Sequence, residues 1–267
     1  MLPIRDDNPT SRVPVMTIAI IALNLLAFLV WEPTFASGPT AEPRQETFFY
    51  CHAEIAWETI HRTSLAEGGE AAQRAIDEGH LGVSGQALQH YLGQRCPNKS
   101  WLVAAFAAMF LHAGWLHLLG NLLFLVIFGN NIEDRFRKVP YLLFYLLSGY
   151  VAAYGFAFAN QSSVEPLIGA SGAISGVLGA YLVLYPRAKV WSLVPFLFFI
   201  PVRIPAWLVL GTWFVLQWVY SAGYAASGAG SVAYLAHIFG FLVGVVIGLF
   251  VRAASPPPRY PVHPRYR

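Results

Sequence analysis

A serine and a histidine in two separate apolar segments are the residues of this sequence that could do chemistry. Ser171 lies in Gly169-Ala170-Ser171-Gly172, near the start of one segment, and His237 lies in Ala236-His237-Ile238-Phe239-Gly240 of another. A serine hydroxyl attacks a carbonyl carbon only when a neighbouring base can take its proton. Polar side chains are costly in hydrocarbon, so both residues are candidates for a functional site. The pair predicts Ser171 as a nucleophile and His237 as its general base.

A second polar pair could stabilise the negative charge that such an attack creates. His117 and Asn121 are four residues apart, so on a helix their side chains share one face. Both side chains donate hydrogen bonds, as an oxyanion site requires. His112 lies about 140° further round an ideal helix than His117, so we expect it to stay apart from this pair.

The composition and the lengths of the apolar segments indicate a membrane protein. Of the 267 residues, 56% are hydrophobic and 12% are charged, and the charged share is about half of that usual in soluble domains. A helix needs about 20 mostly apolar residues to cross the hydrocarbon core. The segments that fit are 14–31, 113–131, 139–159, 168–185, 205–222 and 232–251. They predict an all-α membrane protein, a bundle of six transmembrane helices, with residues 101–112 lying along the outer membrane face.

The distribution of lysine and arginine predicts the orientation of this bundle. With a cytoplasmic N-terminus, 12 of the 17 basic residues fall on the cytoplasmic side, and the other five share one outer segment: Arg44, Arg62, Arg74, Arg95 and Lys99. These topology signals explain the net charge of +3, so we predict no nucleic-acid partner. We expect a multi-pass protein of the cell membrane (inner or plasma membrane) with both termini in the cytoplasm. The first segment is too long for a signal peptide and lacks a cleavage site, so it is expected to remain as a transmembrane helix.

This topology divides the chain into a cytoplasmic segment 1–13, a membrane domain 14–252 and a cytoplasmic tail 253–267. An outer insertion, 32–100, interrupts the membrane domain. The acids of this insertion predict a solvated, partly helical cap: Glu42, Glu46, Glu54, Glu58, Glu67, Glu70, Asp77 and Glu78. Cys51 and Cys96 also lie there, on the oxidising side in bacteria, and either a disulfide or two free thiols fits.

Small residues predict how the reactive groups meet. In this topology the second, fourth and sixth helices run in one direction, with their polar residues near their outer ends. On the fourth and sixth helices, small residues recur every three or four positions. They are Gly172, Ser175, Gly176 and Gly179 on the fourth helix, and Gly240, Gly244 and Gly248 on the sixth. Such spacings let helix backbones approach closely in membranes, and two such faces in contact would bring Ser171 near His237. Glycine zippers also occur in transporters, where a serine and a histidine merely satisfy one another, so the non-catalytic interpretation stays open.

The acids restrict the mechanism. No Asp or Glu lies within the six apolar segments, which predicts a Ser-His dyad without a carboxylate to orient His237. An intramembrane aspartyl protease needs two carboxylates at one site and is disfavoured for the same reason. The sequence contains no HExxH motif, so we predict no metal site.

Together, the serine, histidine and His117-to-Asn121 motifs resemble those of the rhomboid family of intramembrane serine proteases, in its bacterial type. The resemblance covers roughly residues 14–252 without most of the 32–100 insertion, and it implies a six-transmembrane-helix rhomboid-like bundle. It implies an acyl-enzyme mechanism that acts on single-pass transmembrane protein substrates without a cofactor. In this comparison Ser171 is the nucleophile, His237 the general base, and His117, Asn121 and the Ser171 backbone N–H the oxyanion donors. Glu133 resembles a structural acid at the end of the second helix.

Two positions depart from the family pattern. Ser175 stands where the family often has an aromatic residue that packs against the catalytic imidazole, so the support for His237 is expected from another residue. Trp101 is followed by Leu102 instead of the arginine that is often found there. The alternative function is a catalytically inactive rhomboid-like membrane protein that binds transmembrane helices, and a transporter is a third reading. The substrates and the oligomeric state are left open by the sequence.

Overall fold

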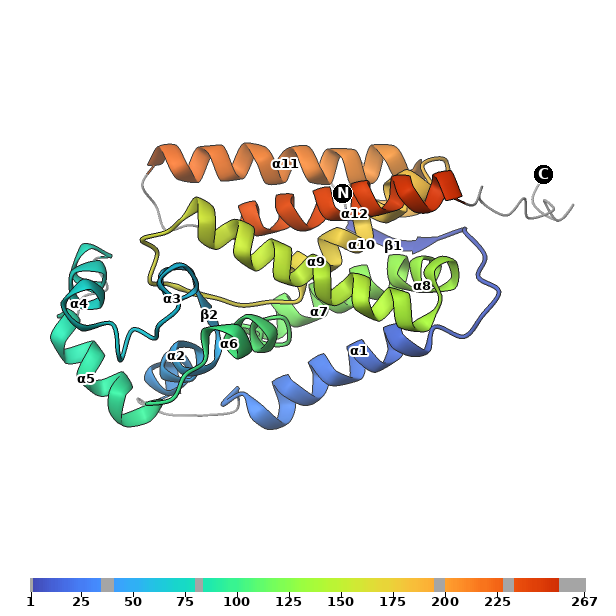
Figure 1. The fold of residues 1–267 in the computed structure, drawn as a ribbon. Helices are drawn as coiled ribbons and strands as arrows, with labels where there is room; N and C mark the ends of the chain where they lie inside the picture. The colour runs from blue at the N-terminus through green and yellow to red at the C-terminus, as the bar shows by residue number, and fades with distance from the viewer. Residues whose placement is uncertain (1, 35–40, 80–83, 195–199, 228–232, 255–267) are drawn as a thin grey trace, which may run out of the picture.

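The chain folds mainly into helices (Figure 1). The computed structural model describes residues 2–34, 41–79, 84–194, 200–227 and 233–254. A helix occupies each of the six apolar segments, and two of the six contain a π-helical turn, η1 or η2. In chain order these helices are α1 (Val15–Leu26) with η1 (Ala27–Trp31), α7 (Trp115–Phe124) with η2 (Leu125–Gly129) and α8 (Asn130–Phe136), α9 (Lys138–Ala159), α10 (Ser171–Leu184), α11 (Ala206–Ser227) and α12 (Tyr234–Ala254).

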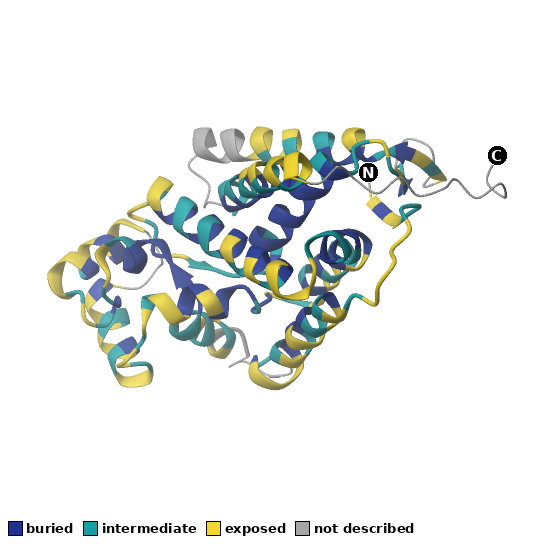
Figure 2. Cartoon of the chain, turned by 45° about the vertical axis from the view of Figure 1, so that its right-hand side comes forward, coloured by how far each residue is buried: buried dark blue, intermediate teal, exposed yellow. Residues whose placement is uncertain are grey.

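The helices have the length and surface of a membrane protein. Three helical stretches are long and apolar enough to cross a membrane, and they are Trp115–Phe136, Lys138–Ala159 and Tyr234–Ala254. Shorter apolar helices cover Val15–Trp31, Ser171–Leu184 and Ala206–Tyr220. Large apolar side chains face outward, since Leu116, Phe158 and Phe250 are 88%, 72% and 71% exposed. Figure 2 shows exposed positions along several of the helices. An apolar surface of this kind suits lipid and not water, so the protein has a mostly helical membrane fold.

Helix α10 forms the centre of the bundle, between α9 and α12. Most of its residues are buried, from Gly172 to Tyr181 without interruption. A Cβ atom on Gly240 would overlap the Gly172 carbonyl oxygen, and one on Gly244 would overlap the Gly176 carbonyl oxygen. The backbones of α10 and α12 are therefore in direct contact, as the glycine spacing predicts.

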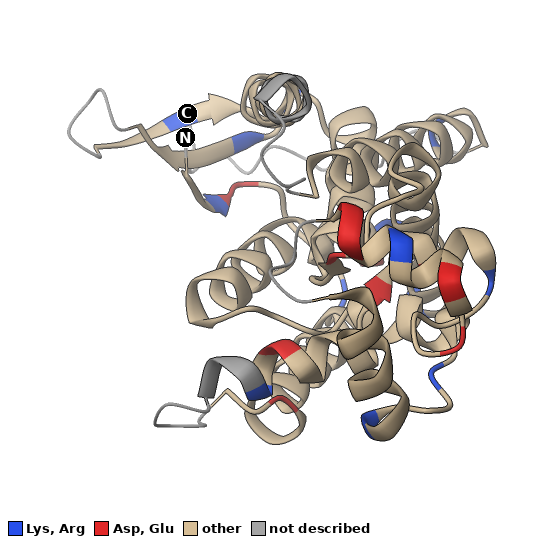
Figure 3. Cartoon of the chain, turned by 90° about the vertical axis from the view of Figure 1, so that its left-hand side faces the viewer, with Lys and Arg blue, Asp and Glu red and all other residues tan. Residues whose placement is uncertain are grey.

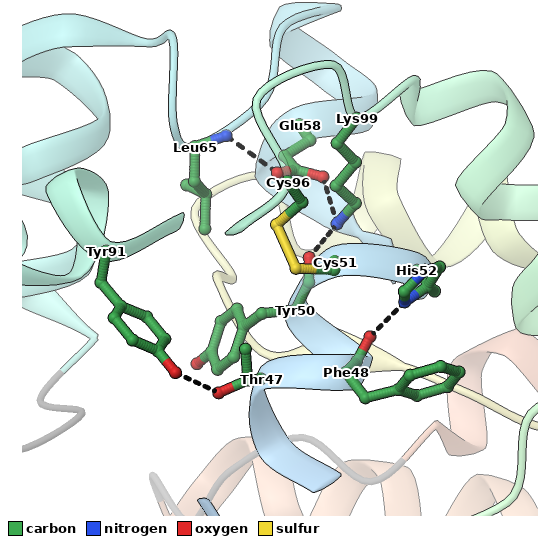
Figure 4. The surroundings of a disulfide bond; sticks show 10 residues. All are labelled: Thr47, Phe48, Tyr50, Cys51, His52, Glu58, Leu65, Tyr91, Cys96 and Lys99. Atoms are coloured by element: carbon green, nitrogen blue, oxygen red, sulfur yellow. Dashed lines mark hydrogen bonds and ion pairs between the residues drawn. A yellow bond between two sulfur atoms is a disulfide. The ribbon is translucent and has the colours of Figure 1, made fainter. Parts of the chain in front are cut away.

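The described residues of the insertion 32–100 fold into a cap at one end of the bundle (Figure 1). Its elements are α2 (Ala41–His52), β2 (Glu54–Ile55), α3 (Ala56–His61), α4 (Gly69–Glu78) and α5 (Gly85–Arg95). They enclose a small core made of Ile55, Trp57, Leu65, Ala72, Ala75, Ile76, Leu92 and Val164. A disulfide between Cys51 and Cys96, with Cα atoms 5.5 Å apart, joins the ends of α2 and α5 (Figure 4). The sequence fits either a disulfide or two free thiols, and the structure has the disulfide.

Two acids of the cap are buried, and the expectation that its acids are solvated is wrong for them. Glu54 and Glu58 are 0% and 1% exposed. Glu58 forms an ion pair of 2.7 Å with Lys99, which also donates a hydrogen bond of 2.7 Å to the Tyr50 carbonyl oxygen (Figure 4). Burial raises the pKa of Glu54 to about 7. The sequence could not show this because Lys99, the counter-charge, lies some 40 residues further along the chain and reaches the acids only through the fold.

The prediction of an all-α fold is incomplete, because the structure also contains two small β-sheets. β1 (Leu2–Asp6), β4 (Lys189–Leu193) and β5 (Pro201–Pro205) form an antiparallel sheet in the order β1-β4-β5. In this sheet Asp6 lies opposite Val190. The Asp6 carboxylate accepts hydrogen bonds from the Tyr181 hydroxyl at 2.6 Å and from the Asn131 amide at 2.8 Å. The N-terminal segment is thus tied to α10 and α8, although the sequence shows only a short polar stretch.

Glu133 fastens the start of α1, which fits the structural role that the resemblance implies. Its carboxylate accepts hydrogen bonds from the Met16 N–H at 2.9 Å and from the N–H and hydroxyl of Thr17, both at 2.8 Å. These N–H groups lie in the first turn of α1 and have no intrahelical partner. Glu133 lies within α8, in the helical stretch Trp115–Phe136, which runs beyond the predicted segment 113–131. Figure 3 shows that most of the helical ribbon nevertheless carries no charge.

Candidate active site

Ser171 and His237 form a hydrogen-bonded pair. Ser171 is the first residue of α10, and His237 lies in the first turn of α12. The His237 Nε2 atom is 2.7 Å from the Ser171 Oγ atom. The glycine contacts between α10 and α12 hold these two helix ends side by side. Both side chains are half-buried, so the pair is sheltered by the bundle without being sealed from its surroundings.

The backbone before Ser171 is held on two sides. Strand β3 (Pro166–Leu167) pairs with β2 of the cap, with Glu54 opposite Leu167. Two residues after the strand, the Gly169 N–H donates a hydrogen bond of 2.8 Å to the carbonyl oxygen of Ala108, the last residue of α6 (Trp101–Ala108). Gly169 has a φ of 121°, a conformation that suits glycine. The approach of the chain to Ser171 is therefore fixed by contacts from both the cap and α6.

His117 and Asn121 lie at the same site. A Cβ atom on Gly169 would be 2.8 Å from His117 Nε2 and 3.5 Å from Ser171 Oγ. The Ala113 N–H points to His117 Nδ1 at 3.4 Å, which leaves the ring proton on Nε2, the atom that faces Gly169. Asn121 is 8% exposed, and its Nδ2 atom is buried with no hydrogen-bond partner among the described residues. A buried donor without an acceptor is uncommon and costly, so this amide is available to an incoming oxygen.

One cavity joins these groups. It has a volume of about 480 Å³, and its lining includes His117, Asn121, Ser171 and His237. The structure therefore brings together all four residues that the sequence singles out. A second cavity of about 20 Å³ opens beside Ser171 and has walls of small residues, among them Ala105, Gly149, Ala152, Gly172 and Ala236.

His112 lies closer to His117 than the helical geometry predicts. The two rings meet edge to face, with centroids 5.0 Å apart. The expectation was wrong because α6 ends at Ala108 and α7 begins at Trp115, so the residues between them do not follow a helix. The His112 backbone N–H donates a hydrogen bond of 3.0 Å to Glu32, which ties this turn to the end of η1.

Gln217 is the site residue that the sequence reasoning missed. Its Oε1 atom is 2.7 Å from His237 Nδ1, on the side of the imidazole opposite Ser171. The Trp213 ring also lies near the imidazole, with centroids 5.9 Å apart. A signal was present in the sequence, because Gln217 is the one amide side chain in the apolar segment 205–222. Ser175 gives the imidazole no such support, since its hydroxyl donates to the Ser171 carbonyl oxygen at 2.6 Å.

This arrangement has the parts that acyl transfer requires. A hydroxyl bonded to an imidazole can act as a nucleophile, and unpaired donors beside it can receive a developing oxyanion. Within the described part of the chain, no three His, Cys, Asp or Glu side chains cluster closely enough to hold a metal ion.

The fold and the site define a helical membrane protein with a hydrogen-bonded serine and histidine in one cavity. Comparison with known proteins identifies its family. The Rhomboid domain matches residues 99–254, more than half of the chain. The protein belongs to the rhomboid family.

Three similar proteins illustrate this relationship. RHOMBOID-like protein 6, mitochondrial, of Arabidopsis thaliana is 32% identical over 161 residues, which cover 58% of this chain and 44% of that protein. Rhomboid protein 1, mitochondrial, of Saccharomyces cerevisiae is 31% identical over 172 residues, or 62% of this chain and 47% of that protein. Putative rhomboid protease YdcA of Bacillus subtilis is 38% identical over 72 residues, or 27% of this chain and 36% of that protein. The chain thus aligns with about half the length of the first two relatives or less.

Replacing Gly169 with alanine tests whether its backbone positions the site. A methyl group there would press on His117 Nε2, and the φ of 121° would strain an alanine. Displacing reacting groups by about 1 Å can cost about 10²-fold in rate, so we expect Gly169→Ala to slow covalent labelling of Ser171 by about that factor. The rate of labelling by a fluorophosphonate measures this effect. Gly211→Ala is the control, because a Cβ atom there meets open space, and an unimpaired Gly169→Ala protein would contradict the positioning role.

Proposed function

We propose that this protein is an intramembrane serine endopeptidase that cleaves single-pass transmembrane proteins near the outer membrane edge. The observation that carries the proposal is the 2.7 Å contact between Ser171 Oγ and His237 Nε2 in a membrane fold of the rhomboid family. In this proposal Ser171 is the nucleophile and His237 is the general base. The reaction needs no cofactor, and its partners are transmembrane substrates and the lipid bilayer.

The proposed topology has six membrane crossings. The three long apolar helices and the three shorter ones supply the crossings, and the basic residues favour cytoplasmic termini. Residues 14–252 then form the membrane domain with the cap on its outer side, and 1–13 and 253–267 are cytoplasmic, of which 255–267 lie outside the described residues. We propose the cell membrane as the location, although two of the relatives carry mitochondrial names.

The proposed chemistry proceeds through an ester on Ser171. The hydroxyl proton moves to His237 Nε2 while Oγ bonds to the scissile carbonyl carbon. The C–N bond then breaks, and the leaving amine takes the proton from His237. A water molecule gives a proton to His237, attacks the ester carbon and releases the new carboxyl group, and Ser171 recovers its proton. The acyl-enzyme divides one difficult step into two easier ones.

The oxyanion in this scheme lies between Asn121, His117 and the start of α10. The unpaired Asn121 Nδ2 and the His117 Nε2–H are donors that line the cavity. Ser171 is the first residue of α10, so its backbone N–H lacks an intrahelical acceptor. The positive end of the helix dipole also favours negative charge at this position. Donors already in place stabilise charge without reorganising during the reaction.

The substrate class follows from the position and shape of the site. Ser171 and His237 lie within the first turns of α10 and α12, at the ends that face outward in the proposed topology. Hydrolytic water can enter there, and a substrate helix must unwind to expose its carbonyl groups. The small cavity beside Ser171 fits a small side chain at the cleaved bond. The alternative function, a rhomboid-like protein that binds transmembrane helices without cutting them, requires none of these groups to react.

Replacing Ser171 with alanine is the primary test of the proposal. Ser171→Ala should abolish both cleavage of a single-pass transmembrane substrate and labelling by a fluorophosphonate, because the attacking oxygen is gone. Ser175→Ala is the matched control, one helical turn away, and it should still be labelled since Ser175 bonds only to the backbone. An unlabelled wild-type protein would favour the inactive alternative.

Replacing Asn121 tests the oxyanion assignment. Loss of one oxyanion donor typically costs about 10²–10³-fold in rate, and His117 and the backbone N–H remain. We expect Asn121→Ala to be labelled at Ser171 but to turn over substrate more slowly by about this factor, measured by initial rates. Turnover equal to that of the wild type would show that Asn121 serves packing alone.

The position of the cut tests the proposed topology. Cleavage should occur near the outer membrane edge of the substrate, at a small side chain, with a helix-weakening Gly or Pro nearby. Replacing that Gly or Pro with Leu should suppress cleavage more than changes in the cytoplasmic half of the substrate helix. Mass spectrometry of the products locates the cut, and cuts in the cytoplasmic half would contradict the orientation and the site.

A further inference from the structure

Gln217 is the polar group that meets the far side of the His237 ring. Its Oε1 atom is 2.7 Å from His237 Nδ1, and the Ser171 Oγ atom is 2.7 Å from His237 Nε2. The two contacts lie on opposite ring nitrogens and come from different helices, α11 and α10. Both polar side chains border the same cavity. The imidazole is thus held at both nitrogens at once.

A neutral imidazole carries one proton, so these two contacts are not independent. For His237 to act as a base, Nε2 must have a free lone pair to receive the Ser171 proton. The ring proton must then be on Nδ1, where it needs an acceptor. The Gln217 amide oxygen is such an acceptor. The other ring state would put the proton on Nε2, where it would donate to Ser171 and block the transfer.

We infer that Gln217 is a positioning residue that selects the reactive tautomer of His237, an inference that rests on the proposed protease function. The amide oxygen accepts the Nδ1–H bond and also fixes the rotation of the ring. This is the role of an orienting side chain in a serine-histidine site, which is often a carboxylate. Gln217 supplies the acceptor without bringing a charge into an apolar helix, where a carboxylate would be costly.

The neutral amide also has a consequence for the pH dependence of the reaction. A carboxylate beside Nδ1 would stabilise the imidazolium form, whereas an amide oxygen does so only weakly. Among the described residues whose contacts are given, Ser171, Trp213 and Tyr234 meet the ring, and His117 borders the same cavity. Of these four, Tyr234 and His117 are the titratable side chains. None of these side chains carries a fixed charge, so none would mask the effect of a carboxylate at position 217 on the protonation of His237.

Two substitutions separate this role from packing. Gln217→Leu keeps similar bulk but removes the acceptor, so both tautomers become accessible, and we expect kcat to fall by up to about 10²-fold with little change in KM. Gln217→Glu keeps an acceptor and adds a charge that favours imidazolium. Because activity requires neutral His237, the acid limb of the pH–rate profile should move to higher pH, by about 1 unit or more. Trp218→Leu is the control on the same helix, since Trp218 is 62% exposed, and it should keep the wild-type profile.

The experiment compares these variants as full-length protein in proteoliposomes. Initial cleavage rates of a transmembrane substrate are measured across pH, and fluorophosphonate labelling reports the reactivity of Ser171 separately. Wild-type kcat in Gln217→Leu would overturn the inference, and so would an unmoved acid limb in Gln217→Glu. Should Gln217→Leu fail to fold, the profile of Gln217→Glu decides alone. An active wild type with unaffected Gln217 variants refutes only this inference, whereas a wild type that neither cleaves nor reacts refutes the proposed function as well.

Discussion

The direct contact between the backbones of α10 and α12 is the constraint on which the site depends. Gly240 packs against the Gly172 carbonyl and Gly244 against the Gly176 carbonyl, with no room for a side chain between them. In a membrane, helices gain little from hiding apolar surface, so close packing of small residues holds them together. Because the contact begins near the start of both helices, it sets Ser171 and His237 at the same depth. A larger residue at these positions would separate the helices and with them Ser171 and His237.

The cap provides a second constraint, which acts on the chain just before Ser171. Strand β3 is paired with β2, and β2 lies between the disulfide at Cys51 and the buried ion pair of Glu58 and Lys99. Val164, from the same connection, belongs to the core of the cap. A buried ion pair contributes little net stability, but breaking it is costly, which favours one arrangement over others. The insertion is therefore part of the scaffold of the site and not an independent appendage.

Polar groups inside the bundle have two kinds of surroundings. At the end away from the cap, Glu133 and Asp6 are occupied by hydrogen bonds that fasten α1 and the β1-β4-β5 sheet to the helices. At the site, His237 is bonded on both nitrogens while the Asn121 amide donor has no partner among the described residues. Buried polar groups are normally satisfied, so the unpaired Asn121 donor is available where an oxygen is proposed to arrive.

Much of this protein could be predicted from local features of its sequence. Apolar length predicted the helices closely, as for 14–31 against Val15–Trp31 and 139–159 against Lys138–Ala159. Glycine spacing predicted the contact between α10 and α12, and the residue types predicted which four side chains meet. These features are readable because helix periodicity and burial in lipid act over a few neighbouring residues.

Only the tertiary structure decided the contacts between distant parts of the chain. The pairing of β2 with β3, the joining of β1 to β4, the burial of Glu58 against Lys99 and the bond from Gln217 to His237 each join segments that no local pattern connects. A two-residue strand has almost no sequence signal, and an amide in an apolar helix does not reveal its partner. Their partners are brought near by the packing of the whole bundle. The sequence therefore determined the candidate site residues and the helices that carry them, whereas the tertiary structure determined which groups orient them.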